Sequence, residues 1–300
     1  MKHIAIKGLV TLVLMVSSSW LLIHNWQHRT IFHKDYAFQA EEQHKFRHFP
    51  KALYDIGLKF WFDNDTTAAT PFFRKAAMQD GLFVDTWLKL AQAEIALGNP
   101  DKAQTILQYL DKLTRNIFRW KWEQILLANE LVMEDLLFGN INYTVKHGIK
   151  VQDAFQLLDG YLDKNVTRAI QVLDTDNLIP YLEWIMRWGR ADDAEILWQK
   201  IMASGTQNED IRLKYIHFLV SQKQVKKAAD IRRQNVDDVD SMTNAGFENE
   251  ITGRGFDWRY TANQKGKWTI RRTLSGAFSG THCLRIRFEG KENISFSHLY

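Results

Sequence analysis

The sequence has little of the chemistry on which catalytic and metal-binding domains depend. Its one cysteine, Cys283, excludes an intramolecular disulfide framework and a cysteine-based zinc site. The sequence contains neither a glycine-rich phosphate loop nor a Gly-x-Ser-x-Gly elbow for a serine nucleophile. The acid pairs Asp192-Asp193 and Asp237-Asp238 lie at predicted helix ends, where the helix dipole or solvation explains them. The sequence therefore predicts a protein that is not an enzyme.

Proline and glycine are also scarce, with 4 and 16 residues, and the net charge is only +4. Few helix breakers, 45% apolar residues and 18 phenylalanines are typical of a helix-rich globular chain with enough material for a core. The positive charge is spread along the chain, so it does not favour a nucleic-acid partner. Three hundred residues suit one large or two medium domains.

The longest apolar run lies near the N-terminus, where residues 4–23 carry one charge, Lys7. At about 1.5 Å per residue, such a helix spans about 30 Å, the hydrocarbon thickness of a bilayer. Lys7 suits one interface, and Trp20 and Trp26 suit the other. We therefore expect a transmembrane signal-anchor over residues 1–25, with a cytoplasmic N-terminus and the bulk of the chain in the periplasm. The alternative is a cleaved signal peptide, with small residues at Ser17–Ser19.

Residues 26–50 form a polar stalk that is rich in histidine. His44 and His48 are spaced i, i+4, as two metal ligands on one helix face would be. A catalytic zinc helix also needs a glutamate after the first histidine, and Lys45 stands there instead. We therefore favour a solvated helical stalk over a metal site.

The stretch from Leu53 to Leu110 repeats itself at a step of 34 residues. The step links Leu53 to Trp87, Ile56 to Leu90, Gly57 to Ala91, Ala69 to Ala103 and Phe73 to Leu107. A repeat of this length, with large and small apolar residues at fixed places, predicts antiparallel helix pairs whose small residues let the backbones approach. The predicted helices cover residues 51–63, 67–79 and 84–97, and Gly98 ends the third of them.

At these residues the sequence resembles the tetratricopeptide repeat family. The matching residues are Trp87, Leu90, Ala91, Gly98, Ala103 and Leu107 in one unit, and Leu53, Ile56, Gly57, Ala69, Phe73 and Ala76 in the unit before it. The resemblance implies a mainly α fold, an α-solenoid of helix pairs over residues 51–240, and a protein partner with no cofactor. It gives packing roles to the small residues Gly57, Ala69, Ala91, Ala103 and Ala194.

Beyond residue 117 the pattern loses its phase. Residues 118–138 favour one long helix, residues 140–148 a turn that marks an insertion, and residues 151–162 another amphipathic helix. Two further units restore the step, from Leu182, Gly189, Ala194 and Trp198 to Ile216, Lys223, Ala228 and Arg232. The polar last helix is typical of a terminal capping repeat.

The family's groove positions, carried over to the first helix of each pair, give a candidate partner-binding groove. Its residues are Tyr54, Leu58, Trp61, Leu88, Gln92, Ile95, Ile179, Glu183, Met186, Leu213 and His217. Family members that hold a partner's C-terminal carboxylate use Lys and Asn at two of these places, which are Tyr54 and Leu58 here, so that clamp is not expected. Two interpretations remain: an apolar groove for a helix or extended segment, or a surface that the stalk covers.

After Asp240 the helical period ends and short alternating runs follow. They are Trp268–Arg271, Cys283–Phe288 and Ile294–His298, and the alternation predicts a β-sandwich. In the second run Arg285 and Arg287 are expected to point outward, and Cys283 is expected to be a buried, inert thiol.

The segments Asn244–Glu248, Gly255–Trp258 and Ser279–Ile286 resemble the galactose-binding-like jelly rolls, which include many carbohydrate-binding modules. The resemblance implies an incomplete β-sandwich over residues 244–300, and we expect a truncated product or a fragment. It also implies a structural calcium ion at Glu248. Aromatic side chains on such a sandwich stack against sugar rings, so Trp258, Tyr260 and Trp268 are candidates for glycan contact, with burial in the core as the alternative.

Three functional hypotheses follow. The first is a non-enzymatic, membrane-anchored scaffold that binds a partner protein through its repeats, in bacterial cell-envelope or exopolysaccharide assembly or export; chains with this combination of parts resemble such proteins. The second is a glycan-binding protein with the repeats as a spacer, which needs an exposed Trp258 or Trp268. The third is a glycosyl-transferring or hydrolysing enzyme, which needs two convergent carboxylates in a pocket.

Overall fold

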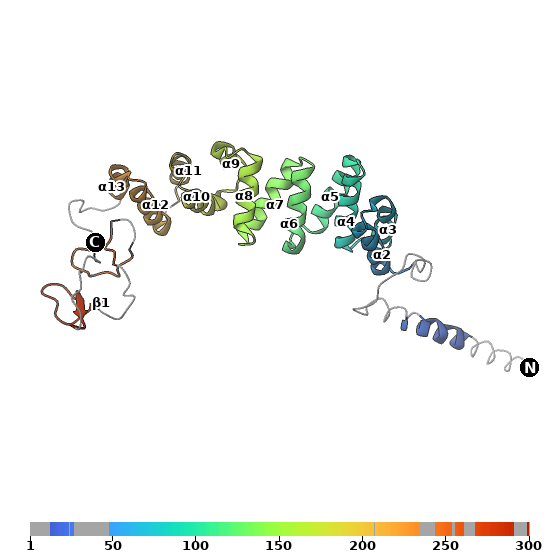
Figure 1. The fold of residues 1–300 in the computed structure, drawn as a ribbon, viewed down its shortest axis with the longest axis horizontal. Coiled ribbons are helices and arrows are strands. Elements are labelled where there is room, and N and C mark those ends of the chain that lie inside the picture. The colour runs from blue at the N-terminus through green and yellow to red at the C-terminus, as the bar shows by residue number, and fades with distance from the viewer. Residues whose placement is uncertain are drawn as a thin grey trace, which may run out of the picture. The chain divides into compact units, whose positions relative to one another are not determined.

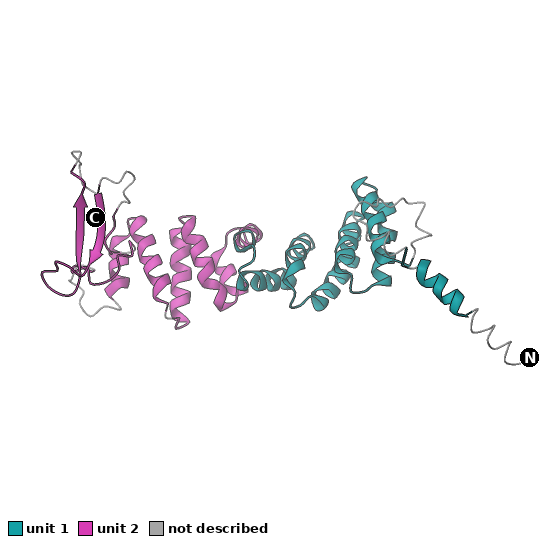
Figure 2. Cartoon of the chain, turned by 90° about the horizontal axis from the view of Figure 1, so that it is seen from below, with its two compact units in different colours: residues 1–154 teal, residues 155–300 magenta. Residues whose placement is uncertain are grey.

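The computed structural model describes residues 13–23, 25–26, 48–206, 208–233, 244–253, 256–260, 268–290 and 299. The fold is mainly α-helical, as Figure 1 shows. The chain divides into two compact units, residues 1–154 and residues 155–300, which Figure 2 distinguishes by colour.

Unit 1 contains three helical hairpins in its described residues. They are α2 Pro50–Phe62 with α3 Thr66–Gln79, α4 Val84–Ala96 with α5 Pro100–Leu113, and α6 Lys121–Glu130 with α7 Glu134–Lys146. Proline at the first position of α2 and α5 suits a place where no N–H donor is needed. The Asp65 carboxylate caps α3 by accepting the Ala68 N–H at 2.9 Å.

The turn inside each of these hairpins has the same backbone. Asn64, Gly98 and Val132 are 34 residues apart, and all three are left-handed, with φ of 60°, 74° and 55°. The next residue donates its N–H back into the first helix, from Asp65 to Phe60, from Asn99 to Glu94 and from Met133 to Ala128, at 2.8 to 2.9 Å. These are Schellman-type helix ends, and they keep the 34-residue step through the third hairpin.

The prediction of one long helix over residues 118–138, followed by a turn at 140–148, is therefore wrong. A short 3₁₀ turn, Phe118–Trp120, leads into α6, the chain reverses at Val132, and Asn140 lies within α7. No insertion interrupts the step. Ile125 stands where the earlier hairpins have Gly57 and Ala91, and it is fully buried. The large residue at this crossing conceals the repeat in the sequence.

The small residues lie where the two helices of a hairpin cross. A Cβ added to Gly57 would lie 2.7 Å from Phe73 Cε1, so the ring of α3 fills the space that a side chain on α2 would need. Ala69, Ala91 and Ala103 are also fully buried. Across the three hairpins the first residue of this pair grows, from Gly57 to Ala91 to Ile125, while the second changes from the aromatic Phe73 to the aliphatic Leu107 and Ile141.

Unit 2 continues the helical pattern. Its helices are α9 Val166–Val172, α10 Leu178–Arg187, α11 Ala191–Ala203, α12 Glu209–Ser221 and α13 Val225–Arg233, after α8 Val151–Tyr161, which begins in unit 1. Gly189 and Lys223 hold the left-handed turn positions, with φ of 69° and 61°. The restored step is confirmed there, although Lys223 replaces glycine. Ala194 is fully buried in α11.

The C-terminal segment forms a small sheet. Strands β1 Trp268–Thr273 and β2 Cys283–Phe288 pair antiparallel, with Trp268 opposite Phe288 and Thr273 opposite Cys283. Two of the three predicted strands are thus confirmed, and the third, at 294–298, lies outside the described residues. Within the described part of the chain this two-stranded sheet and one isolated bridge stand in place of the expected β-sandwich.

The predicted membrane anchor is described only in part. Residues 13–23 are helical with exposed apolar side chains. Residues 1–12 of the anchor and residues 27–47, which make up most of the stalk, lie outside the described residues. No helix among the residues that the structure describes is both long enough and apolar enough to cross a bilayer.

Candidate functional site

The predicted groove residues of unit 1 lie on the first helices of its hairpins. We call their shared surface the A-helix face, formed by Tyr54, Leu58 and Trp61 on α2, Leu88, Lys89, Gln92 and Ile95 on α4, and Trp122 and Leu126 on α6. The 34-residue step puts Trp122 in the position of Tyr54 and Leu126 in that of Leu58. Sequence reasoning missed these two residues because it lost the register at α6.

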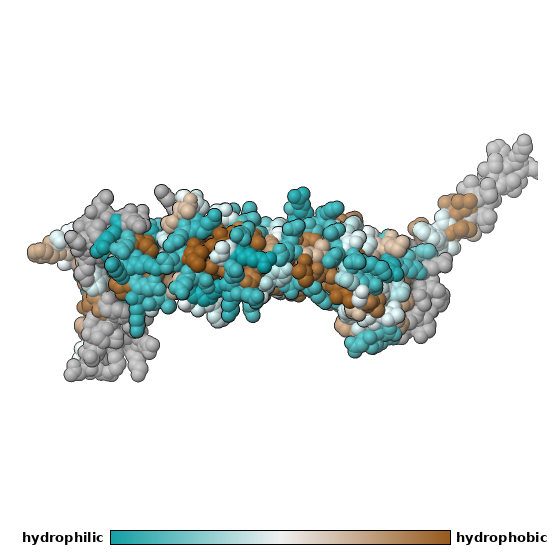
Figure 3. Space-filling model, turned by 90° about the horizontal axis from the view of Figure 1, so that it is seen from above, coloured by the Kyte–Doolittle hydropathy of each residue, from teal (hydrophilic) through white to brown (hydrophobic). Residues whose placement is uncertain are grey.

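The side chains of this face differ in how far solvent reaches them. Leu126 is 45% exposed, whereas Leu88 is 5% exposed and cannot line a groove. Tyr54 and Trp61 are half-buried, because they pack against the core around Phe73. Gln92 and Ile95 are also half-buried. The space-filling view shows hydrophobic patches along the helices, separated by hydrophilic side chains (Figure 3).

Cations lie over the aromatic rings of unit 1 on this side. Lys51 Nζ is 5.8 Å from the ring centroid of Tyr54, and Lys89 Nζ is 5.3 Å from that of Trp61. Lys150 Nζ lies 4.8 Å from the Trp122 ring. Such pairs typically occur about once per 70–80 residues, and three of them involve aromatic rings of this face.

The environment of the face also alters its titrating groups. Burial, together with the negative charges of Asp85 and Asp55, raises the pKa of Tyr54 to about 12. Burial lowers the pKa of Lys89, because incomplete solvation disfavours its charged form. The A-helix face therefore combines aromatic rings with a cation that is only partly hydrated.

The predicted groove residues of unit 2 lie on α10 and α12. Ile179, Glu183 and Met186 are half-buried on α10, and the Glu183 carboxylate pairs with Lys214 Nζ at 2.6 Å. Leu213 and His217 are half-buried on α12. His217 Nδ1 lies 2.8 Å from the guanidinium of Arg259.

A buried polar network that the sequence did not indicate holds α8 to the hairpin of α10 and α11. The Asp159 carboxylate accepts the Tyr181 hydroxyl at 2.5 Å, the Trp184 indole N–H at 3.2 Å and a guanidinium N–H of Arg190 at 2.6 Å. Burial and the Asp159 hydrogen bond raise the pKa of Tyr181 well above its usual range. Every partner of the carboxylate is a structural donor, so the network fixes packing.

Glu248 is held by the loop between the strands. Its carboxylate accepts the Thr281 N–H at 2.9 Å and hydroxyl at 2.6 Å, and the His282 N–H at 3.3 Å. These bonds, the Thr281 hydroxyl first, lower the pKa of Glu248 to about 2. Gly280 has φ of 71°, which favours glycine, and a Cβ there would lie 1.9 Å from Glu248 Oε1, so a larger residue would displace the Glu248 carboxylate.

This arrangement gives Glu248 a role without a metal ion. Calcium takes about six to eight oxygen ligands. The residues that the structure describes contain no group of three or more Asp, Glu, His or Cys side chains that could hold a metal. Calcium binding at Glu248 stays a prediction.

The three candidates for glycan contact are placed differently. Trp268 is 6% exposed, and its burial leaves no ring face for a sugar. Trp258 is half-buried, stacks near Phe247 and donates its indole N–H to the Asn244 carbonyl at 3.1 Å. Tyr260 is 47% exposed and so is the candidate that solvent reaches best.

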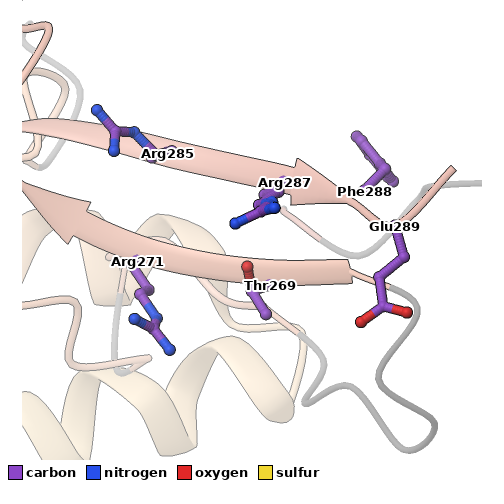
Figure 4. Close-up of a pocket in the computed structure, with 6 residues that line it drawn as sticks. All are labelled: Thr269, Arg271, Arg285, Arg287, Phe288 and Glu289. Atoms are coloured by element: carbon purple, nitrogen blue, oxygen red, sulfur yellow. The ribbon is translucent and has the colours of Figure 1, made fainter.

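One face of the two-stranded sheet is rich in arginine. Arg271 lies opposite Arg285 in the strand register, and Arg287 is two residues further along β2, around a shallow cavity of about 600 Å³. All three are exposed, as expected for Arg285 and Arg287, and Figure 4 shows the Arg271 and Arg285 guanidinium groups pointing away from each other. Cys283, at the start of β2, is half-buried rather than buried.

Comparison with solved structures gives matches of low similarity. The protein "MamA 41-end from Desulfovibrio magneticus RS-1" is 14% identical over 62% of this chain and 92% of its own, with a TM-score of 0.35. The Cut9–Hcn1 hetero-tetramer of the APC/C is 13% identical over 65% of this chain and 41% of its own, with a TM-score of 0.26. A putative kinesin light chain from Podosopora anserina is 14% identical over 63% and 93%, with a TM-score of 0.25. These TM-scores lie below 0.5, which is too low to infer a shared fold or function from these structures.

A search of curated proteins gave no match. The tetratricopeptide repeat family model matches residues 63–118, which span α3, the hairpin of α4 and α5, and the turn beyond it. These are the residues whose 34-residue step and left-handed turn recur in the neighbouring hairpins. Residues 63–118 of this chain are therefore similar to the tetratricopeptide repeat.

Proposed function

We propose that the protein is a non-enzymatic scaffold that binds a partner protein along the A-helix face of unit 1. The single observation that supports this most strongly is the alignment of exposed or half-exposed residues at equivalent repeat positions, from Leu58 through Gln92 to Leu126. A stack of hairpins gives such positions a continuous surface, which is how repeat proteins bind extended partners. The tetratricopeptide match over residues 63–118 is consistent with an interaction scaffold.

A photo-crosslinking amino acid placed at Leu126 tests this proposal. The matched control carries the same amino acid at Met78, which is 78% exposed on α3, a second helix of a hairpin. We expect a specific cross-linked protein from position 126 in cells and none from position 78. Equal yields of the same product from both positions, or none from position 126, would contradict the proposal.

We further propose that residues 1–25 anchor the chain in a bacterial membrane, with the rest of the chain outside the cytoplasm, and that it serves exopolysaccharide assembly or export. The exposed apolar side chains of residues 13–23 and the flanking Trp20 and Trp26 support an anchor. We expect the chain to stay in the membrane pellet after alkaline extraction, and a Leu21→Glu/Leu22→Glu double variant to become extractable.

The single cysteine offers a test of topology. Cys283 is half-buried, so a denaturing step is not needed to reach its thiol with a small reagent. We expect a membrane-impermeant maleimide to label Cys283 in intact spheroplasts, with Cys283→Ser as the control. Labelling only after lysis would place the bulk of the chain in the cytoplasm instead. Trp268 is buried, so the glycan-binding alternative depends on Trp258, which is half-buried, with Tyr260 as the more exposed ring beside it in the sequence.

A further inference from the structure

We propose that the A-helix face of unit 1 binds an acidic segment of its partner protein, with Lys89 as the central cation. The inference rests on the proposed function, because it names the chemistry of the partner that the same face would take. The observations that support it are the contacts of Lys89 and those of Asp85, the nearest acidic residue on α4.

Lys89 has no counter-ion among the residues that the structure describes. Its ammonium lies over the Trp61 ring, 5.3 Å from the centroid, and donates to Gln92 Oε1 at 2.9 Å. Among the described residues no carboxylate forms an ion pair with it. An ammonium that is half-buried in this way has lost part of its hydration, and an amide oxygen and a ring face only partly replace it. A carboxylate from a partner would complete its shell.

The acid that could have neutralised Lys89 is directed elsewhere. Asp85 is one helical turn before Lys89, a spacing at which opposite charges usually meet. However, Asp85 Oδ1 accepts the Trp120 indole N–H at 2.7 Å, and its Oδ2 lies 3.8 Å from the Arg119 guanidinium. The start of the third hairpin thus engages Asp85 and leaves Lys89 without a negative charge.

A second cation on the same unit has similar surroundings. Lys150 is exposed, and its ammonium lies 4.8 Å from the centroid of the Trp122 ring. Within the described residues it too forms no ion pair with a carboxylate. An ammonium can donate three hydrogen bonds, and one that rests on a ring keeps donors for a ligand that approaches from solvent.

The corresponding face of unit 2 lacks this feature. Lys214 on α12 pairs with Glu183 at 2.6 Å and with Asp210 at 2.5 Å. Lys227 on α13 pairs with Glu195 at 2.5 Å. These two lysines of unit 2 are paired with carboxylates of the chain itself, whereas Lys89 and Lys150 of unit 1 lie over aromatic rings without such a pair among the described residues. Charge complementarity therefore favours an acidic segment over a purely apolar helix.

The experiment measures binding of fluorescein-labelled decaglutamate to the purified full chain in detergent, by anisotropy at low salt. We expect Lys89→Gln to weaken binding about tenfold, since hydrogen bonds to charged groups are worth about 1.5–3 kcal/mol. Lys89→Arg should retain binding, because a guanidinium keeps the charge and stacks on Trp61. The control is Lys75→Gln on α3, which removes the same charge from another exposed surface.

Equal weakening by Lys75→Gln, equal binding of labelled decaglutamine, or no effect of Lys89→Gln would each overturn the inference. Cross-linking from Leu126 separates this outcome from a failure of the proposed function. If a partner still cross-links at wild-type yield to the Lys89→Gln variant, the scaffold function is supported and the acidic partner segment is ruled out. If no partner cross-links from position 126 when Lys89 is unchanged, the scaffold function itself is contradicted.

Discussion

The first and third hairpins of unit 1 share one backbone and differ in the side chains at the helix crossing. In the first hairpin Gly57 meets the Phe73 ring, and Asn64 holds the left-handed turn. In the third, Ile125 occupies the crossing and Val132 the turn, and Ile125 and Ile141 are both fully buried. The same backbone crossing therefore accepts different pairs of side chains, filled from the second helix in the first hairpin and from both helices in the third.

The turn residues of the hairpins also differ in type while they keep the same left-handed conformation, and the conformational strain depends on the residue. Asparagine and glycine enter the left-handed region readily, but a β-branched valine does so only under strain. Val132 nevertheless has φ of 55°, and Met133 closes the same backbone hydrogen bond as in the other hairpins. Packing of α6 against α7 therefore imposes the turn on a residue that disfavours it.

The largest expected effect removes the side chain that fills the third crossing. Ile125→Ala should lower the free energy of unfolding by about 2–5 kcal/mol, because it leaves a cavity between α6 and α7. The control is Leu126→Ala on the next residue of α6, which is 45% exposed and should change stability by under about 0.5 kcal/mol. Thermal unfolding followed by circular dichroism checks both, and equal losses would show that Ile125 is not the crossing residue.

The next prediction converts the first crossing into the third. Gly57→Ile should destabilise the chain by about 1–3 kcal/mol, because the new side chain collides with the Phe73 ring. Adding Phe73→Ile reproduces the pair found at Ile125 and Ile141 and should recover part of the loss. If the double variant unfolds at a lower temperature than the single one, the complementarity of the two positions fails.

A reciprocal exchange at the turns should have smaller effects of opposite sign. Val132→Gly should stabilise the chain by about 1 kcal/mol, since it relieves left-handed strain and Val132 is 67% exposed. Gly98→Val should destabilise it by a similar amount, because a Cβ at Gly98 meets no atom within 4 Å and only the backbone conformation opposes it. Melting temperatures that move in the same direction for both variants would refute a common turn conformation.

The smallest effect lies outside the hairpins and tests whether they are independent of the strands. The folded-state pKa of Glu248 is lowered, so its contribution to stability is present above the ordinary value of 4.5 and is lost as the pH falls towards about 2. Glu248→Gln should therefore loosen the loop at neutral pH and differ less from the wild type as the pH falls through this range. Amide exchange at Thr281, compared at pH 6 and pH 3, measures this. A difference at pH 3 as large as that at pH 6 would be inconsistent with a role for the charged carboxylate.

Part of the candidate site could be predicted because apolar periodicity and small residues report local packing. Tyr54, Leu58 and Trp61 came from the groove positions of the tetratricopeptide repeat family, which the register of Gly57 places on this chain. Trp122 and Leu126 did not, since the register is invisible where Ile125 and Leu137 replace the small residues. The cations of the face also escaped prediction, because whether Lys89 finds a carboxylate depends on the direction that Asp85 takes.

The β segment shows the limit of a period-two pattern. Alternation in Cys283–Phe288 predicted a strand with Arg285 and Arg287 exposed, and both features are present, but Phe288, predicted to point inward, is 46% exposed. Alternation carries no information on how many strands pair or which aromatic ring is covered. The burial of Trp268 and the attachment of Glu248 to the Thr281 loop both depend on segments that are distant in sequence.

By itself the sequence determined the helical hairpins, their 34-residue step and the two strands, because these depend on side-chain spacing and on local backbone preferences. Only the tertiary structure decided where the step continues through large residues, which aromatic rings stay accessible and which lysine lacks a counter-ion. Those properties depend on side-chain volumes and charges contributed by different helices, and a local sequence pattern describes only one helix at a time.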